Sequence, residues 1–239
     1  MKIAIISDLH GEHPKRLVEK CLEEDFSCFA FLGDYDTPQI VDYLMSLRVP
    51  DNIVLMGNHD YHHNIGDNLV CRDFDSRAWL RYQDARDFIE RWSLVEDNMH
   101  FGLKTSRFVD GIKIGFVHSS LQPGIKPSLK QNYLWGNLDT PKEQIENFRA
   151  MTSFNMDLLF RGHEHTPYIL NINRGQNLSG VGVELDEVAK AVTRTTPGFD
   201  NPLVLGSDRR HVISVPAFKY RGYAIFDSET SSLEFRKYS

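Results

Sequence analysis

The side chains best suited to chemistry in this sequence stand directly after short apolar runs. Each run has the length and composition of a buried strand, and each ends in carboxylate, imidazole or amide groups. Loops at such strand ends are where open α/β sheets keep their reactive groups. Collected from five strand ends, the residues are Asp8, His10, Asp34, Asn58, His59, His118, His163 and His165.

This set combines imidazole, carboxylate and amide ligands and contains no thiolate. Such ligands suit borderline divalent metals, namely Mn, Fe or Zn, better than Ca or a structural zinc. The set is too large for a single ion, but two divalent metal ions that share a bridging carboxylate would use it. A pair about 3.5–4 Å apart is the arrangement that holds the attacking and leaving oxygens in phosphoryl displacement.

Two of the motifs place their polar residues two positions apart. Asp8 and His10 follow the first apolar run, and His163 and His165 follow a later one. In extended chain, positions i and i+2 point to the same side, so each pair is expected to face one cleft. Asp-x-His alone is common, and Gly57-Asn58-His59-Asp60 alone is compatible with a solvated turn. Recurrence of the pattern at several strand ends favours a shared site.

The segments that must position these loops alternate between strands and helices in the N-terminal part of the chain. Apolar runs at 2–6, 28–32 and 53–56 predict strands. Amphipathic segments at 14–24 and after Thr37-Pro38 predict helices. This βαβαβ order predicts a largely parallel sheet with right-handed crossovers.

The later part of the chain has a different pattern. The Asp110-Gly111 turn predicts a hairpin between 107–109 and 112–117, and a capping box from Thr140 to Glu143 predicts the start of a helix. From Tyr168 onward the pattern indicates antiparallel strands, which suggests a second sheet packed on the first. Further strands are predicted at 157–160, 168–172, 212–215, 222–226 and 233–236, and a helix at 184–192.

Composition narrows the class of protein. With 239 residues and 41% hydrophobic content, the chain can bury a full core as one domain. The net charge of -6 argues against binding of nucleic acid by bulk electrostatics. Three cysteines without CxxC spacing indicate reduced thiols rather than disulfides. No run is long enough for a signal segment or a membrane span, so we expect a cytoplasmic protein without a membrane partner.

In order and spacing, the motifs resemble those of the calcineurin-like metallophosphoesterase superfamily. They are Asp8-x-His10, Gly33-Asp34, Gly57-Asn58-His59-Asp60, His118 and Gly162-His163-x-His165. The resemblance implies the α/β (α+β) fold class, as a four-layer αββα sandwich of two mixed β-sheets flanked by helices. We expect a single domain over residues 1–239, with insertions near 61–106 and 173–210.

The resemblance also implies how the ligands are shared between two metals. One metal would be held by Asp8, His10, Asp34 and His165. The second would be held by Asp34, Asn58, His118 and His163, with Asp34 bridging. Two divalent ions, two carboxylates and a bridging hydroxide leave a charge of roughly +1, which would attract an anionic phosphoester.

The implied activity is metal-dependent hydrolysis of a phosphomonoester, a phosphodiester or a nucleotide. A hydroxide that bridges the two metals would attack phosphorus in line. His59 is expected to be catalytic as the general acid for the leaving oxygen, and Asp34 as the shared carboxylate.

The chain departs from the family pattern after Asp34. Members that act on phosphoproteins commonly show GD-x-x-D-R-G, whereas Tyr35-Asp36-Thr37-Pro38 follows here. This difference weakens a protein-phosphatase interpretation. It leaves both Asp36 and Asp60 as candidates for the residue that orients His59. Glu164, inside the last motif, is expected to point away from the metals.

Residues 61–106 interrupt the alternation of strands and helices. A helix is predicted at 76–92, and core packing with solvated arginines accounts for its pattern. The alternative is an insertion that covers the site and grips a base or a phosphate. The remaining histidines, His13, His62, His63, His100 and His211, are expected on the surface. The candidate substrate contacts are Arg77, Arg81, His13 and His62.

Two other functions compete with a small-molecule phosphoesterase. One is a non-catalytic scaffold on the same fold, but every ligand position and His59 are intact. The other is a nuclease, against which the acidic composition counts. The favoured substrate is therefore a small phosphoester or a nucleotide.

Overall fold

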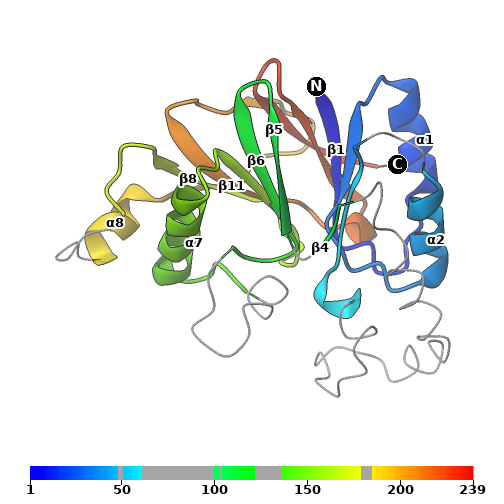
Figure 1. Ribbon diagram of the computed structural model, residues 1–239, viewed down its shortest axis with the longest axis horizontal. Coiled ribbons are helices and arrows are strands. Elements are labelled where there is room, and N and C mark those ends of the chain that lie inside the picture. The colour runs from blue at the N-terminus through cyan, green and yellow to red at the C-terminus, as the bar shows by residue number, and fades with distance from the viewer. Residues whose placement is uncertain (48–50, 61–99, 103, 122–135, 179–184, 239) are drawn as a thin grey trace.

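The computed structural model of the chain describes residues 1–47, 51–60, 100–102, 104–121, 136–178 and 185–238. The described strands form one sheet of seven strands and one of six. Figure 1 shows the two sheets face to face, with α1 and α2 outside one sheet and α7 and α8 outside the other. The predicted four-layer αββα sandwich of mixed sheets is confirmed.

The first sheet has the strand order β10-β13-β12-β1-β2-β3-β4. Strands β1 to β4 are parallel, and β12 joins β1 in the antiparallel sense. Its elements and connecting helices are β1 (Lys2–Ile6), α1 (Lys15–Glu23), β2 (Cys28–Phe31), α2 (Pro38–Ser46), β3 (Ile53–Leu55), β4 (His100–Gly102), β10 (Leu203–Val204), β12 (Gly222–Asp227) and β13 (Ser232–Lys237).

The second sheet has the strand order β5-β6-β7-β11-β8-β9. Strands β6, β7 and β11 are parallel, and the outer strands are antiparallel to their neighbours. Its elements, with the remaining helices, are β5 (Lys104–Val109), β6 (Ile112–Val117), α7 (Pro141–Ser153), β7 (Leu158–Arg161), β8 (Tyr168–Asn173), α8 (Leu185–Ala191), β9 (Thr193–Thr195), β11 (Arg209–Ser214) and the 3₁₀ turn η1 (Phe218–Tyr220).

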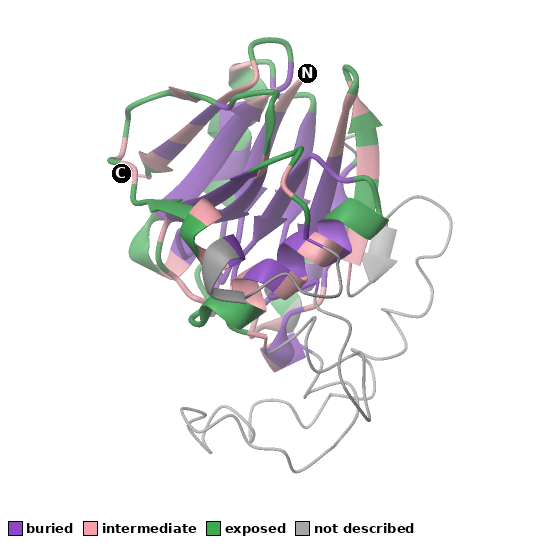
Figure 2. Cartoon of the chain, turned by 90° about the vertical axis from the view of Figure 1, so that its left-hand side faces the viewer, coloured by how far each residue is buried: buried purple, intermediate pink, exposed green. Residues whose placement is uncertain are grey.

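Strand periodicity explains how the layers pack. In β1, Ile3 and Ile5 face the core between the two sheets, while Ala4 and Ile6 face the core beneath α1 and α2. A third core lies between the second sheet and α7 and α8. Figure 2 shows the central strands buried along most of their length. Burial on both faces accounts for the nearly continuous apolar runs of these strands.

The two predicted helix starts differ in how they are capped. The capping box before α7 is confirmed, because the Thr140 side chain accepts from the Glu143 N–H and the Glu143 side chain accepts in return. Thr37 does occupy the N-cap position of α2, but its side chain makes no capping hydrogen bond. There, Pro38 at the first helical position remains as the start signal.

The expectation that the C-terminal strands build a second sheet holds for only some of them. Strands β10, β12 and β13 extend the first sheet, whereas β8, β9 and β11 belong to the second. The second sheet begins earlier, with the β5–β6 hairpin that the Asp110-Gly111 turn predicted. Partner choice depends on long-range packing, which local alternation does not encode.

Part of the predicted insertions consists of regular structure. Residues 100–102 and 104–109 form β4 and β5, and α8, β9 and β10 lie within 173–210. The predicted helix at 76–92 lies outside the described residues. Among the helices of the described ranges, none combines the length and the apolar character that crossing a bilayer requires.

Candidate metal centre

The predicted site residues follow the C-terminal ends of strands from both sheets. Asp8 and His10 follow β1, Asp34 follows β2, and Asn58 and His59 follow β3 in the first sheet. In the second sheet, His118 follows β6, while His163 and His165 follow β7. Parallel strands bring their C-terminal ends to one edge, and the facing sheets bring the two edges together.

One group of side chains gathers around Asp8. Nε2 of His10 lies 3.0 Å from Nε2 of His165, which in turn lies 3.5 Å from Oδ1 of Asp8. Nε2 of His10 also lies 3.8 Å from Oδ2 of Asp34. These residues are far apart in the sequence, but their ligand atoms converge on one point.

A second group gathers around Asn58. Its Oδ1 lies 3.0 Å from Nε2 of His118 and 3.1 Å from Nδ1 of His163. Nε2 of His118 lies 3.5 Å from Oδ2 of Asp34. Oδ2 of Asp34 therefore lies next to ligand atoms of both groups.

The contacts of His10 and His118 show which ring nitrogen of each imidazole carries the hydrogen, and this tautomer suits metal binding. Nδ1 of His118 donates to the carbonyl of Leu32 at 2.7 Å, and Nδ1 of His10 donates to Asp36 at 2.9 Å. These contacts leave the Nε2 lone pairs directed into the site, as in histidines that bind metals. Groups with ligand spacing are Asp8-His10-His165, Asp8-Asp34-His118 and His10-Asp34-His59. This donor set of nitrogen and oxygen fits Mn, Fe or Zn.

The backbone at the site is not extended. The expectation that positions i and i+2 share a cleft because the chain is extended there is therefore wrong. The first and third residues of the Asp-x-His, Asp-x-Asp and His-x-His motifs all adopt the left-handed region, with φ between 46° and 69°. That conformation is uncommon for residues other than glycine and is concentrated at functional sites. The six residues are Asp8, His10, Asp34, Asp36, His163 and His165.

Two glycines permit the loops to approach one another. A Cβ on Gly57 would lie 2.0 Å from Oδ1 of Asp34, and a Cβ on Gly162 would lie 2.6 Å from Oδ2 of Asp8. A methyl group at either position would therefore displace a predicted ligand. The glycines of the GNHD and GHxH motifs have a direct steric role.

The structure distinguishes between the two candidates for the partner of His59. Nδ1 of His59 donates to Oδ1 of Asp36 at 2.8 Å. Asp60 instead accepts from the backbone N–H groups of Gly57, Asp34 and Tyr35 at 2.7–2.9 Å. Asp36 thus orients the imidazole, while Asp60 holds the loops after β2 and β3 together.

Burial and hydrogen bonding shift the acidities of these groups. Burial alone would raise the pKa of Asp36, but hydrogen bonds from His10 and His59 outweigh it and hold this pKa well below its usual range. Burial would likewise raise the pKa of Asp8, but its interactions, chiefly the hydrogen bond with His165, hold this pKa below its usual range. Burial, together with the nearby His118, lowers the pKa of His163 to about 4, so this imidazole is neutral at pH 7.

Sequence reasoning missed a buried cation beside the site. Arg161, the last residue of β7, is fully buried and pairs with Glu164 at 2.5 Å. It also donates to the carbonyls of Ser119 and Gly136 and to the Tyr168 hydroxyl. Glu164 was expected to point away from the metals, and its carboxylate is paired with Arg161. The i,i+3 spacing of an arginine and the acid inside GHxH was the available signal.

The candidate substrate contacts are placed only in part. His13 is exposed, and its ring lies 4.8 Å from that of Tyr43. Its Nδ1 accepts from the Lys15 N–H at 3.2 Å. Arg77, Arg81 and His62 lie outside the described residues, as does His63, and these contacts stay predictions.

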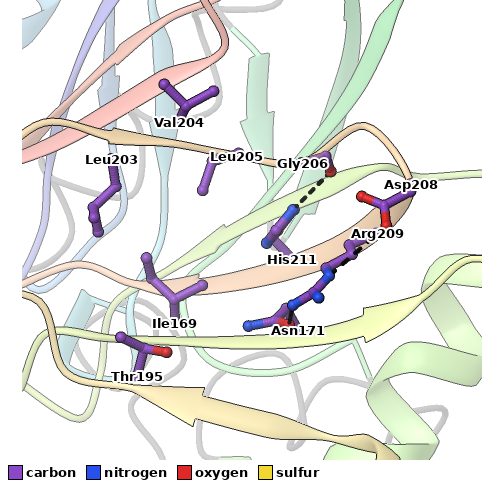
Figure 3. A pocket seen from close by; sticks show the side chains of 10 residues that line it. All are labelled: Ile169, Asn171, Thr195, Leu203, Val204, Leu205, Gly206, Asp208, Arg209 and His211. Carbon is purple, nitrogen blue, oxygen red and sulfur yellow. Dashed lines mark hydrogen bonds and ion pairs between the residues drawn. The ribbon is translucent and has the colours of Figure 1, made fainter.

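The surface prediction for His211 is wrong. This residue is 5% exposed, because β11 lies between β7 and β8 and alternate β11 residues face the core between the sheets. Its Nε2 donates to the carbonyl of Gly206 at 3.1 Å (Figure 3). His211 lines a pocket of about 380 Å³ near the N-terminal end of β11, at the opposite end of the sheet from His163.

Comparisons with known proteins agree with this architecture. The family profile of the calcineurin-like phosphoesterase superfamily domain matches residues 1–182. No curated protein gives a significant match.

Solved structures share the fold at low sequence identity. A metallophosphoesterase from Sphaerobacter thermophilus superposes with a TM-score of 0.65 at 20% identity, covering 100% of this chain and 89% of that one. A hypothetical protein from Pyrococcus horikoshii gives 0.58 at 11% identity, with 99% and 87% covered. A novel archaeal phosphodiesterase gives 0.50 at 14% identity, with both chains fully covered. At these identities the likeness establishes the fold.

Proposed function

The chain belongs to the calcineurin-like phosphoesterase superfamily, and we propose that it is a dinuclear metal-dependent phosphoesterase acting on a small phosphomonoester, phosphodiester or nucleotide. Members of this superfamily generally hydrolyse phosphoester bonds. The observation that carries the proposal is the position of Asp34. Its Oδ2 lies 3.8 Å from Nε2 of His10 in one ligand group and 3.5 Å from Nε2 of His118 in the other.

The proposed ligand sets divide the converging side chains between two divalent ions, which would be Mn, Fe or Zn. Asp8, His10 and His165 would hold one ion, and Asn58, His118 and His163 the other, with Asp34 shared. When bound, such a pair supplies an activated water and neutralises charge on the phosphoryl oxygens. The side chains fix where that chemistry occurs.

His59 would hold the proton for the leaving oxygen. Its Nδ1–H is committed to Asp36, so the transferable proton would reside on Nε2. Asp36 keeps the ring in this orientation and, as a carboxylate, stabilises the protonated imidazole. The His59 backbone N–H donates to Oδ1 of Asp34 at 3.0 Å, which ties the proposed acid to the shared carboxylate.

Hydrolysis of p-nitrophenyl phosphate and bis(p-nitrophenyl) phosphate with added Mn²⁺ tests the proposal. We expect turnover of at least one ester by the wild type and none above background by Asp34→Asn. Inactivity with Mn²⁺, Fe²⁺ and Zn²⁺ would instead favour a scaffold. Digestion of plasmid DNA without hydrolysis of either small ester would indicate a nuclease.

A further inference from the structure

The turn that precedes β12 is attached directly to the loops of the metal centre. The Phe218 N–H donates to the carbonyl of Ser7 at 2.8 Å, and the Lys219 N–H donates to that of Asp8 at 3.3 Å. The Ala217 N–H donates to the carbonyl of His165, also at 3.3 Å. These are main-chain contacts, so replacing the side chain of Tyr220 does not remove them.

This turn presents Tyr220 beside the site. The tyrosine is 64% exposed, and its ring centroid lies 6.1 Å from that of His165 in an edge-to-face arrangement. Nζ of Lys219 lies 5.1 Å from the ring centroid and covers one face. Its exposure leaves ring surface on which a base can stack. A single exposed aromatic residue is ordinary, as Phe108 at 74% exposure illustrates. What distinguishes Tyr220 is its position next to His165.

We propose that Tyr220 is a specificity-determining residue that stacks on the base of a nucleotide substrate. The inference rests on the proposed phosphoesterase function, because the phosphoryl group must lie at the metal centre next to His165. A base attached to that phosphoryl group through a ribose would reach the adjacent tyrosine ring. Stacking of a base on an aromatic side chain is strong and tolerates any base, because every base has a π-face. Lys219 adds a cation over the ring and positive charge for an anionic ester.

Adenosine 5′-monophosphate and ribose 5-phosphate form a matched pair of probes, which share the ribose and the phosphate and differ at C1, where one carries adenine and the other a hydroxyl. Calorimetric titration of the Mn²⁺-loaded protein gives their affinities without requiring turnover. We expect the wild type to bind the nucleotide at least tenfold more tightly than the sugar phosphate. Tyr220→Ala should abolish this preference and leave the affinity for ribose 5-phosphate within twofold of the wild-type value. Tyr220→Phe should restore the preference.

Phe108→Ala is the control, because it removes an exposed aromatic ring near the Asp110-Gly111 turn, at the end of the β5–β6 hairpin away from His118. It should leave both affinities unchanged. Equal affinity of the wild type for the two probes, or a preference that survives in Tyr220→Ala, would overturn the inference.

Hydrolysis of both probes in parallel separates this inference from the proposed function. Cleavage of ribose 5-phosphate without any preference for the nucleotide rejects the role of Tyr220 and keeps the phosphoesterase. Tyr220-dependent binding of the nucleotide without cleavage of any phosphoester keeps the role of Tyr220 and rejects the enzyme. Loss of both properties rejects both.

Discussion

His59 is held by Asp36, whose Oδ1 accepts from the imidazole Nδ1 at 2.8 Å. The other carboxylate oxygen accepts from His10, so a single residue orients both the proposed acid and a proposed ligand. Asp36 stands two positions after Asp34. Members of the family that act on phosphoproteins have the corresponding aspartate three positions after theirs. Asp36 has a left-handed backbone, and its carboxylate contacts both imidazoles.

Asp36→Asn should reduce both turnover and metal affinity. An amide places an N–H where one of the imidazoles now finds a carboxylate oxygen, so at least one ring loses its acceptor. Loss of such an orienting partner typically costs 10–100-fold, and we expect about that factor in kcat and in the Kd for Mn²⁺. Glu19→Gln, on the exposed side of α1, is the charge-matched control and should change neither. Wild-type values in Asp36→Asn would contradict the assignment.

His59→Ala should retain two metals per chain and lose about 10²–10⁴-fold in kcat. The contact of His59 with Asp34 uses the backbone N–H, which alanine preserves. His59 nevertheless falls in a ligand-spaced group with His10 and Asp34, so metal content decides between the two roles. Metal analysis beside steady-state kinetics checks this. Loss of one metal from His59→Ala would show that His59 is a ligand. Normal turnover of this variant would contradict its role as the general acid.

Gly57→Ala should impair the site through Asp34. The added methyl group would lie 2.0 Å from Oδ1 and 2.5 Å from the backbone nitrogen of Asp34, so the loop after β2 must move. Overpacking of this kind costs about 1–3 kcal/mol of unfolding free energy, and Mn²⁺ binding should weaken with it. Gly175→Ala is the control, because a Cβ there meets nothing within 4 Å. Denaturant unfolding and metal titration of both variants measure the two effects, and identical behaviour would refute the steric role.

The buried His211 should make stability depend on pH. Burial lowers the pKa of this imidazole below its ordinary value of 6.5, so the unfolded chain binds a proton before the folded one as pH falls. Its contribution is therefore present above about pH 6.5 and is lost as pH decreases toward the folded-state pKa. The unfolding free energy of the wild type should fall relative to that of His211→Asn between pH 7.5 and pH 5. A difference that is constant with pH would mean that His211 titrates normally.

The sequence indicates that the proposed ligand loops share an edge, because each loop follows a strand with a clear apolar run. Asp34 and Asn58 follow parallel strands of the first sheet, which end at a common edge, whereas His118 joins them because the second sheet faces the first. The sequence did not show whether Asp36 or Asp60 orients His59. That depends on a left-handed turn and on which loop donates its N–H groups. Burial of His211 depends on the central position of β11 in the second sheet, and that pairing is non-local. Tyr220 carries no local motif, and only the folded turn brings it to His165.

Two cations are proposed to share Asp34. Diffraction from crystals grown with Mn²⁺, recorded with anomalous scattering, tests it most directly. We expect two anomalous peaks about 3.5–4 Å apart, one beside Asp8, His10 and His165 and the other beside Asn58, His118 and His163, with Asp34 touching both. No peak at these residues, or a single ion that leaves Asp34 unbound, would contradict the account.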